Sequence, residues 1–390
     1  MRYVTGGESH GPALTAIVEG VPAGLKISEK QINIDLERRQ SGYGRGGRQT
    51  IEKDTVRVLS GIRFGKTIGS PVTLLVENKD WENWEERMAA FGKPPADLKR
   101  EITPRPGHAD LVGVLKNNTD DCRDILERAS ARETAARVAA AGIAREFLAD
   151  LGVNLFSYVV SIGSVALKED DPILAAPDYK PLDIELSDLR CPDEKTSEEM
   201  KKEISKARKA GDTLGGTFRV VATGLLPGLG SYADHNRRLT SQIGGAIFSI
   251  PAIKGLEFGL GFEATRRRGS KVHDAITHTK KDGFMRGSNN AGGLEGGMTT
   301  GMPLIVTAGM KPISTLMKPL DTINIDTLEP EKAWRERSDV CAVPAAAVVA
   351  EAELAFVLAN AYLEKFGGDN MTDIKASIKA YKQRIRTMSR

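Results

Sequence analysis

The chain has 390 residues, of which 40% are hydrophobic and 27% are charged, a balance typical of a globular protein with a large core. The net charge is only +3, so overall charge does not favour nucleic acid or a membrane surface as partner, and an anion site requires local clustering. Cys122, Cys191 and Cys341 are widely spaced and form no CxxC pair, which argues against a disulfide framework or a zinc site.

The N-terminal sequence MRYVTGGESHG lacks the apolar segment of a secretory signal, and the chain has no run of eighteen apolar residues. We therefore expect a cytoplasmic protein without a membrane-spanning helix. Six segments have the composition of β-strands. They are residues 13–21, 55–62, 71–77, 155–167, 216–224 and 303–309.

Helices alternate with these strands. Ser28 followed by Gln31 is a capping-box pattern that opens a helix running to about residue 38 or 39. Ser130 followed by Glu133 is a second such pattern, ahead of an alanine-rich helix over 131–152. Pro344 suits the first turn of another alanine-rich helix, which ends at a glycine pair.

Alanine buries little area per residue, so two alanine-rich helices need close neighbours on more than one side. This predicts an α+β fold in which a helical layer is packed between β-sheets. No linker or fixed repeat divides the chain, so we expect a single domain over 1–390. The charged segments at 80–100 and 168–210 are expected to be surface excursions from it.

The stretch RRQSGYGRGGRQ (38–49) contains four arginines and four glycines. Glycine lets the backbone approach a ligand closely, and arginine makes planar, bidentate contacts to carboxylate or phosphate. The stretch follows a predicted helix inside a folded chain, which favours a small polyanion as its ligand. A solvated surface loop and an RNA contact are the alternatives.

Two histidines lie in turns flanked by glycine or proline: His10 in GESHG and His108 in PRPGHAD, three residues after Arg105. Histidine is the usual proton carrier near neutral pH, whereas no paired-histidine spacing here supports a metal site. We interpret both as candidates for proton transfer, with a structural role as the alternative.

Two further features suit anion or cofactor binding. The helix start at Ser130 and Arg132 offers free N–H groups and positive charge, although an ordinary helix cap explains it equally. The glycine-rich segment before 303 and the following KPISTL suggest a backbone-lined pocket with Lys311, Ser314 and Thr315, or simply tight turns. GKT at 65–67 and GLGFEA at 259–264 lack the context of a P-loop or a Rossmann motif.

Seven motifs occur in the order seen in chorismate synthases, so the chain resembles that family over nearly its whole length. They are GESHG, RRQSGYGRGGRQ, RPGHADL, RASARETA, SNNAGGLEGG, MKPISTL and RSDVCAVPAA. The resemblance implies anti-1,4-elimination of phosphate from 5-enolpyruvylshikimate 3-phosphate to give chorismate, with reduced FMN required although no net redox change occurs. It also implies the helical layer between antiparallel sheets and a homotetramer.

The resemblance also implies site residues. The substrate carries two carboxylates and a phosphate, which suits the arginines at matching positions: Arg39, Arg45, Arg48, Arg105, Arg132 and Arg337. FMN contacts are implied for Ser130, Ala131, Arg132, Pro251, Ala252, Gly296, Lys311, Pro312, Ile313, Ser314, Thr315 and Arg337. Many relatives carry a different residue at Pro251.

In the mechanism that the resemblance implies, the substrate transiently receives electron density from reduced flavin, phosphate leaves, and hydrogen is lost to the flavin side. His10 protonates the departing phosphate, and His108 adjusts the flavin's protonation. Asp339 relays the proton, with Ser9 and Ser130. NADPH is expected only as an indirect electron source, through an external flavin reductase. A phosphate-ester lyase without flavin and an RNA-binding module are the runner-up hypotheses.

Overall fold

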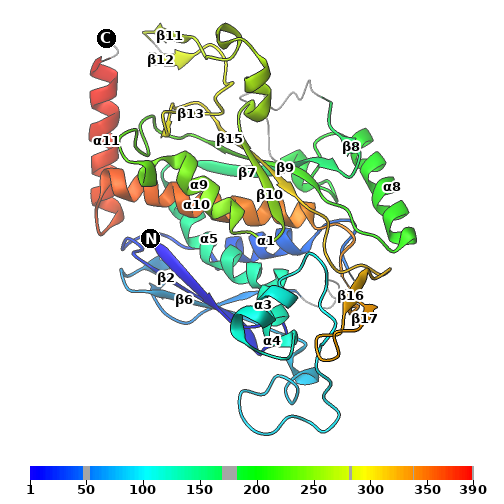
Figure 1. The fold of residues 1–390 in the computed structure, drawn as a ribbon. Coiled ribbons are helices and arrows are strands. Elements are labelled where there is room, and N and C mark those ends of the chain that lie inside the picture. The colour runs from blue at the N-terminus through cyan, green and yellow to red at the C-terminus, as the bar shows by residue number, and fades with distance from the viewer. Residues whose placement is uncertain (47–52, 169–181, 281–282, 337, 389–390) are drawn as a thin grey trace.

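The structure is a computed structural model of the chain, and it describes residues 1–46, 53–168, 182–280, 283–336 and 338–388. Two antiparallel sheets enclose a layer of helices (Figure 1). The first sheet has the order β1 (Arg2–Gly6), β2 (Ala13–Glu19), β6 (Val72–Glu77), β3 (Val56–Val58). The second has the order β10 (Ile253–Phe258), β15 (Leu304–Met310), β9 (Gly216–Thr223), β7 (Asn154–Ile162), β8 (Val165–Ala166).

The helical layer consists mainly of α1 (Glu29–Gln40), α5 (Thr134–Asp150) and α10 (Val343–Phe366). The helix α5 packs on β2 and β6, whereas α10 packs on β7 and β9, and the two helices pack on each other. Small residues permit this closeness: a Cβ built on Gly142 of α5 would lie 2.6 Å from Ile32 Cγ1 of α1. The α+β sandwich predicted from the alanine-rich helices is thus confirmed.

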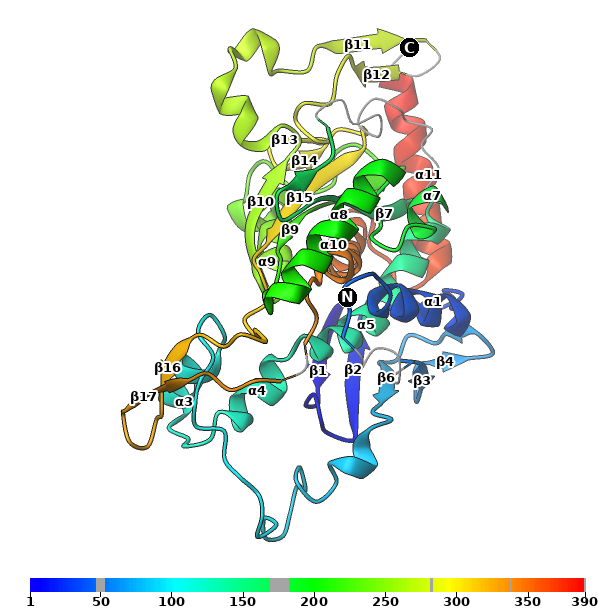
Figure 2. The same cartoon turned by 90° about the vertical axis from the view of Figure 1, so that its right-hand side faces the viewer.

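Smaller elements surround this sandwich. The remaining helices are α3 (Asp110–Asn117), α4 (Arg123–Ala129), α7 (Leu182–Glu185), α8 (Glu194–Ala210), α9 (Leu239–Phe248) and α11 (Met371–Met388). The remaining strands form four two-stranded pairs: β4 (Ile62–Arg63) with β5 (Lys66–Thr67), β11 (Ile276–Thr279) with β12 (Gly283–Arg286), β13 (Leu294–Glu295) with β14 (Met298–Thr299), and β16 (Asp321–Ile323) with β17 (Pro330–Lys332). Figure 2 shows α3, α4, β16 and β17 grouped at one side of the first sheet.

Several local expectations hold and others need correction. Ser28 caps α1 by accepting from the Gln31 N–H, as expected. Ser130 instead caps a short 3₁₀ turn, η2 (Ala131–Glu133), that precedes α5. The strand expected over 155–167 is a hairpin, because Gly163 turns the chain at a φ of 55° between β7 and β8.

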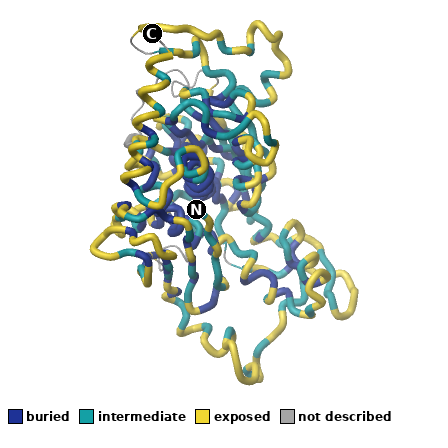
Figure 3. Tube along the Cα trace, turned by 90° about the vertical axis from the view of Figure 1, so that its left-hand side faces the viewer, coloured by how far each residue is buried: buried dark blue, intermediate teal, exposed yellow. Residues whose placement is uncertain are grey.

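The two charged segments differ in their surroundings. The chain from 81 to 99 runs out from the sandwich and is largely exposed (Figure 3). The helix α8 lies in the segment expected to be a surface excursion, yet it buries Met200 and Ile204 in the main core. Its charged residues therefore cover only its outer faces.

One helix among the described residues, α10, is long and apolar enough to cross a membrane. Our search for uninterrupted apolar runs missed it because Glu351 and Glu353 interrupt its apolar sequence. Within the fold, 89% of its most apolar window is buried, which is the setting of a core helix.

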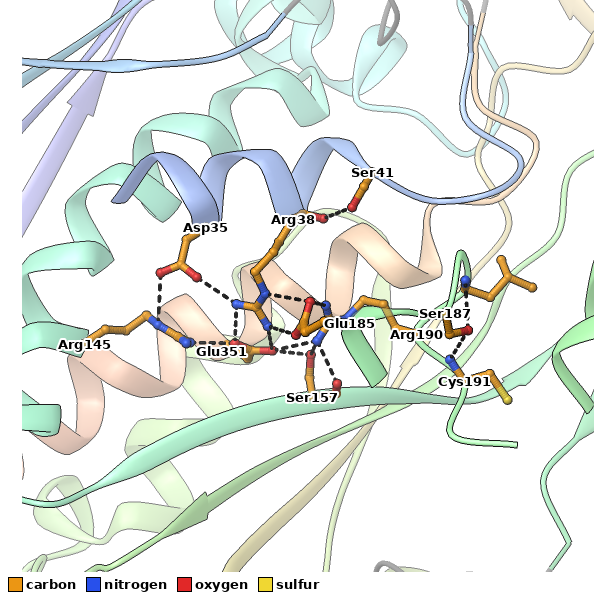
Figure 4. Close-up of polar contacts among 11 residues, drawn as sticks. Asp35, Arg38, Ser41, Arg145, Ser157, Glu185, Ser187, Arg190, Cys191 and Glu351 are labelled. Carbon is orange, nitrogen blue, oxygen red and sulfur yellow. Dashed lines mark hydrogen bonds and ion pairs between the residues drawn. The ribbon is translucent and has the colours of Figure 1, made fainter. Parts of the chain in front are cut away.

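Glu351 lies at the centre of an ion network that crosses the helical layer (Figure 4). Its carboxylate, fully buried, pairs with Arg38 of α1 at 2.8 Å, Arg145 of α5 at 2.5 Å and Arg190 at 3.3 Å. Ser157 of β7 donates a further bond to it at 2.5 Å. Burial opposes ionisation, but the three guanidinium groups hold the pKa of Glu351 well below its usual value.

Candidate active site

His10 is buried beside α4. Its Nδ1 is 2.8 Å from Glu127 Oε1, and its backbone N–H donates to Glu127 Oε2 at 2.8 Å. The Trp84 ring covers the imidazole with a centroid distance of 3.9 Å. On the other side, Nε2 is 3.9 Å from Glu336 Oε1. The histidine is therefore oriented by a buried carboxylate and an aromatic ring.

His108 also has a buried carboxylate partner, Asp110 at the start of α3, which contacts its Nδ1. Arg105 pairs with the same carboxylate at 2.8 Å and donates to Thr315 Oγ1 at 2.9 Å, and its Nη2 lies 3.1 Å from His108 Nδ1. Burial opposes ionisation of Asp110, but the bonds from His108 and Arg105 hold its pKa well below its usual value. This cluster thus joins the RPGHAD and KPISTL motifs.

Glu336 links the two histidine clusters, because its Oε2 is 3.9 Å from Arg105 Nη1 while its Oε1 faces His10. The hydroxyls of Ser9 and Ser130 are 3.2 Å apart beside His10, and the Ser9 N–H donates to the Glu127 carbonyl at 2.9 Å. Four motifs distant in sequence therefore meet here.

Arg39 and Arg132 converge on one buried carboxylate, that of Asp54. The ion-pair distances are 2.7 Å from Arg39 Nη2 to Asp54 Oδ2 and 2.9 Å from Arg132 Nη1 to Asp54 Oδ1. Burial opposes ionisation of Asp54, but both arginines lower its pKa, and burial lowers the pKa of Arg39. The shared Asp54 carboxylate therefore holds two guanidinium groups close together.

The described part of the arginine–glycine loop is tied to the RSDVC motif. Arg45 Nη1 is 2.7 Å from Asp339 Oδ2, and the Gly46 N–H donates to Asp339 Oδ1 at 2.6 Å. Arg48 and Arg337 lie outside the described residues. The Nε groups of Arg39 and Arg45 are buried and have no hydrogen-bond partner among the residues that the structure describes, a feature that suits an absent polar ligand.

Most of the expected cofactor residues lie in two places: KPIST with the adjoining 251–252 turn, and the η2 turn. Lys311 N–H donates to the Ala252 carbonyl at 2.9 Å, and Ser314 Oγ donates to the Gly107 carbonyl at 3.0 Å, so KPIST lies between the 251–252 turn and RPGHAD. Burial, and next the charge of Lys254, lower the pKa of Lys311. In the sequence, Pro251 precedes Ala252, and Pro312 and Ile313 lie between Lys311 and Ser314. Ala131 lies in the η2 turn, between Ser130 and Arg132.

The remaining expected cofactor residue, Gly296, belongs to another segment of the chain. It lies in the β13–β14 turn, which is held near residues 300–303, before β15 begins; Lys311 follows the last residue of β15. The glycines serve the turn itself, since Gly296 and Gly297 have φ of 58° and 83°.

Our sequence reasoning missed the acidic and aromatic partners: Glu127, Asp110, Asp54, Glu336 and Trp84. Asp110 had a local signal, because it directly follows the "HA" of PRPGHAD. Glu127 lies nearly one helical turn before Ser130, so it shares that motif's neighbourhood. Asp54 and Glu336 had no local signal, since their partners are distant in sequence.

Comparison with known proteins identifies this arrangement. A family model described as chorismate synthase matches residues 1–363. The chain belongs to the chorismate synthase family. A crystal structure of a chorismate synthase superposes with a TM-score of 0.81 at 43% identity, covering 99% of this chain and 98% of the other.

Curated chorismate synthases match along nearly the full length. The enzyme from Aquifex aeolicus (strain VF5) is 52% identical over 99% of this chain and 98% of its own. The enzyme from Desulforudis audaxviator (strain MP104C) is 53% identical with the same coverage. The expectation of chorismate synthase function, a carbon–oxygen lyase activity of the shikimate pathway acting on a small molecule, is thereby confirmed.

Proposed function

We propose that the residues around His10 and His108 form the active site of the enzyme. There the enzyme eliminates phosphate from 5-enolpyruvylshikimate 3-phosphate to give chorismate, with reduced FMN bound beside the substrate. The observation that carries this proposal is the convergence of His10, His108, Arg105 and Thr315 on one linked cluster, with Glu336 between its halves. Arg39 and Arg132 lie on its border through Ser130.

The substrate's three acidic groups require several fixed cations. Arg39, Arg132 and Arg105 are each nine-tenths or more buried and held by carboxylates, so their guanidinium groups are pre-oriented for bidentate contacts. Arg45 joins them at the loop, held by Asp339. We assign the same role to Arg48 and Arg337 from their motifs alone.

In this proposal, His10 donates a proton to the departing phosphate from Nε2, since Nδ1 is engaged by Glu127. His108 lies beside Thr315 and Arg105, where it would govern protonation near the flavin ring. Ser9, Ser130 and Asp339 complete the proton path. The buried carboxylates hold each imidazole in one orientation.

The donor set around KPIST fits an anionic, ring-shaped cofactor. Lys311 supplies a partly buried cation, and Ser314 and Thr315 supply hydroxyls. Ser130, Ala131, Arg132, Pro251 and Ala252 supply backbone and side-chain contacts on either side. When bound, reduced FMN supplies the transient electron density that a C–H bond remote from any carbonyl requires.

Several features of the proposal come from family analogy. We expect a cytoplasmic homotetramer, whose FMN is reduced by an outside flavin reductase, with NADPH only as the distant electron source. The described chain contributes no recognised nicotinamide motif to this assignment.

An anaerobic assay tests the proposed function. Purified protein is supplied with 5-enolpyruvylshikimate 3-phosphate, with and without chemically reduced FMN, and phosphate and chorismate are measured. Equal release of both products only with reduced FMN supports the proposal. Phosphate release without flavin would favour a flavin-independent lyase, and turnover in neither arm would contradict the assignment.

Lys311→Met is expected to weaken FMN binding by about tenfold or more, because a charge-assisted contact to an anion contributes roughly 1.5–3 kcal/mol. Binding is measured by the change in FMN fluorescence on titration with protein. Lys254→Met is the matched control, since it removes the neighbouring exposed lysine. Equal affinities for the two variants would remove Lys311 from the cofactor site.

His108→Ala is expected to lower turnover with saturating substrate and reduced FMN by at least about tenfold, since a lost proton carrier typically costs a hundredfold or more. Stopped-flow measurement of chorismate formation gives the rate. The control is His273→Ala, which removes an exposed histidine two residues after the η5 turn (Gly269–Lys271). This substitution should leave the rate unchanged. A near-normal rate in His108→Ala would exclude this histidine from proton transfer.

A further inference from the structure

The Glu127 carboxylate contacts both the His10 imidazole and the Arg123 guanidinium group. Its Oε1 is 2.8 Å from His10 Nδ1 and 2.9 Å from Arg123 Nη1, one turn earlier on α4. Both carboxylate oxygens are within hydrogen-bond distance of His10, at 2.8 and 3.0 Å. With its side chain only 2% exposed, Glu127 exerts its charge on these two partners with little screening by water.

Arg123 is itself held in place from several directions. Its Nη2 donates to Glu101 Oε1 at 3.0 Å. Its guanidinium carbon lies 5.3 Å from the centroid of Trp84 and 5.6 Å from that of Trp334. Trp84 in turn packs against His10. Arg123 therefore cannot move away from Glu127 without disturbing two aromatic rings and a second carboxylate.

We propose that Glu127 and Arg123 are positioning residues for the reaction: Glu127 holds His10 through Nδ1 and favours its protonated form, while Arg123 limits that effect by sharing the same oxygen. This proposal rests on the role of His10 as proton donor proposed above. It explains why a partly buried arginine accompanies the histidine, although it bonds to Glu127 on the Nδ1 side of the ring and not on the Nε2 side.

Other charges near His10 act on every variant alike. Glu336 faces Nε2 and contacts Arg105 through its other carboxylate oxygen. Glu101 pairs with Arg123. Among the described residues, Glu127 and Glu336 face the imidazole directly, Arg123 and Arg105 are linked to it through these carboxylates, and Glu101 is linked through Arg123. Removal of Glu127 and removal of Arg123 therefore change the field at Nδ1 in opposite directions against a constant background.

NMR titration of His10 tests the proposal directly in the full-length protein without substrate. The chain has only five histidines, so His10→Gln identifies the His10 signal in protein labelled at histidine. Glu127→Gln should move the His10 titration midpoint down by about one pH unit or more, because an opposite charge at this distance shifts a pKa by 1–3 units. Arg123→Met should move it up, and Arg123→Lys should return it toward the wild-type value.

Arg128→Met is the matched control, because Arg128 lies on the same helix but bonds to Thr5 and the Gly7 carbonyl at the surface. It should leave the midpoint unchanged. Shifts of the same sign in Glu127→Gln and Arg123→Met, or no shift in either, would overturn the proposal. If Glu127→Gln fails to fold, the opposite behaviour of Arg123→Met and Arg123→Lys still decides it.

The pH dependence of turnover connects the titration to the reaction. Turnover falls at high pH as the proton donor loses its proton. This high-pH limb of the kcat profile should move with the His10 midpoint in each variant. A midpoint that moves while the profile does not would contradict the role in the reaction. Absence of chorismate formation by the wild-type protein would refute the proposed function, whereas the titration shifts would still be measurable.

Discussion

Glu351→Ala is expected to lower the free energy of unfolding by about 3–5 kcal/mol, the cost typical of breaking a buried ion pair from one side. The substitution leaves Arg38, Arg145 and Arg190 without their common carboxylate in the interior of the helical layer (Figure 4). Urea unfolding followed by circular dichroism at neutral pH measures the change.

Glu364→Ala is the matched control for this substitution. It makes the same change on the same helix, but Glu364 pairs with Arg237 at the surface, where both side chains are well exposed. An exposed pair contributes at most about 1 kcal/mol. If the two variants lose similar stability, the network around Glu351 does not stabilise the layer as described.

The Glu351 contribution also has a defined pH dependence. Its pKa in the folded protein is lowered from the ordinary 4.5, chiefly by Arg38, Arg145 and Arg190 against the opposing effect of burial. The stabilisation is therefore complete above the unfolded-state pKa and is lost as the pH falls through the folded-state value. The stability difference between wild type and Glu351→Ala should therefore stay constant from pH 7 to about pH 5 and shrink only as the pH falls below 4.5.

His10→Ala is expected to lower turnover by about a hundredfold or more, because the substitution removes the proposed proton donor while Glu127 keeps its pair with Arg123. The rate is measured anaerobically at saturating substrate with reduced FMN. Substrate affinity should change much less, since the arginines that bind the acidic groups keep their own carboxylate partners.

His235→Ala controls for the loss of a histidine in general, as its side chain is 88% exposed. It should turn over at the wild-type rate. A His10→Ala enzyme within tenfold of wild type would show that another group protonates the phosphate.

The main helices of the fold were predictable because their sequence signals lie within or directly beside them. Ser28 lies directly before its helix, and the alanine-rich composition of α5 and α10 reflects the close packing of the layer. The different partners of the adjacent residues Arg38 and Arg39 were not predictable from the sequence. Adjacent helical residues point about 100° apart, so Arg39 faces Asp54 while Arg38 faces Glu351.

The candidate site follows the same division. The histidines and arginines were identifiable from their motifs, and the structure brings His10, Arg105 and Thr315 together. Among their acidic partners, Asp110 lies within PRPGHAD and Glu127 lies close to Ser130, whereas Asp54 and Glu336 had no local signal because their partners are distant in sequence. Glycine-rich sequence supports both ligand loops and tight turns: the structure shows that Gly296 lies in the β13–β14 turn, and its contact with the cofactor stays a prediction.

The central claim is that distant motifs form one pocket for substrate and flavin. Diffraction from crystals grown with 5-enolpyruvylshikimate 3-phosphate and oxidised FMN measures this directly. The account predicts substrate carboxylates and phosphate at hydrogen-bond distance, about 3 Å, from Arg39, Arg105 and Arg132, with the flavin against KPIST. Substrate bound elsewhere, with these arginines still paired only to Asp54 and Asp110, would contradict it.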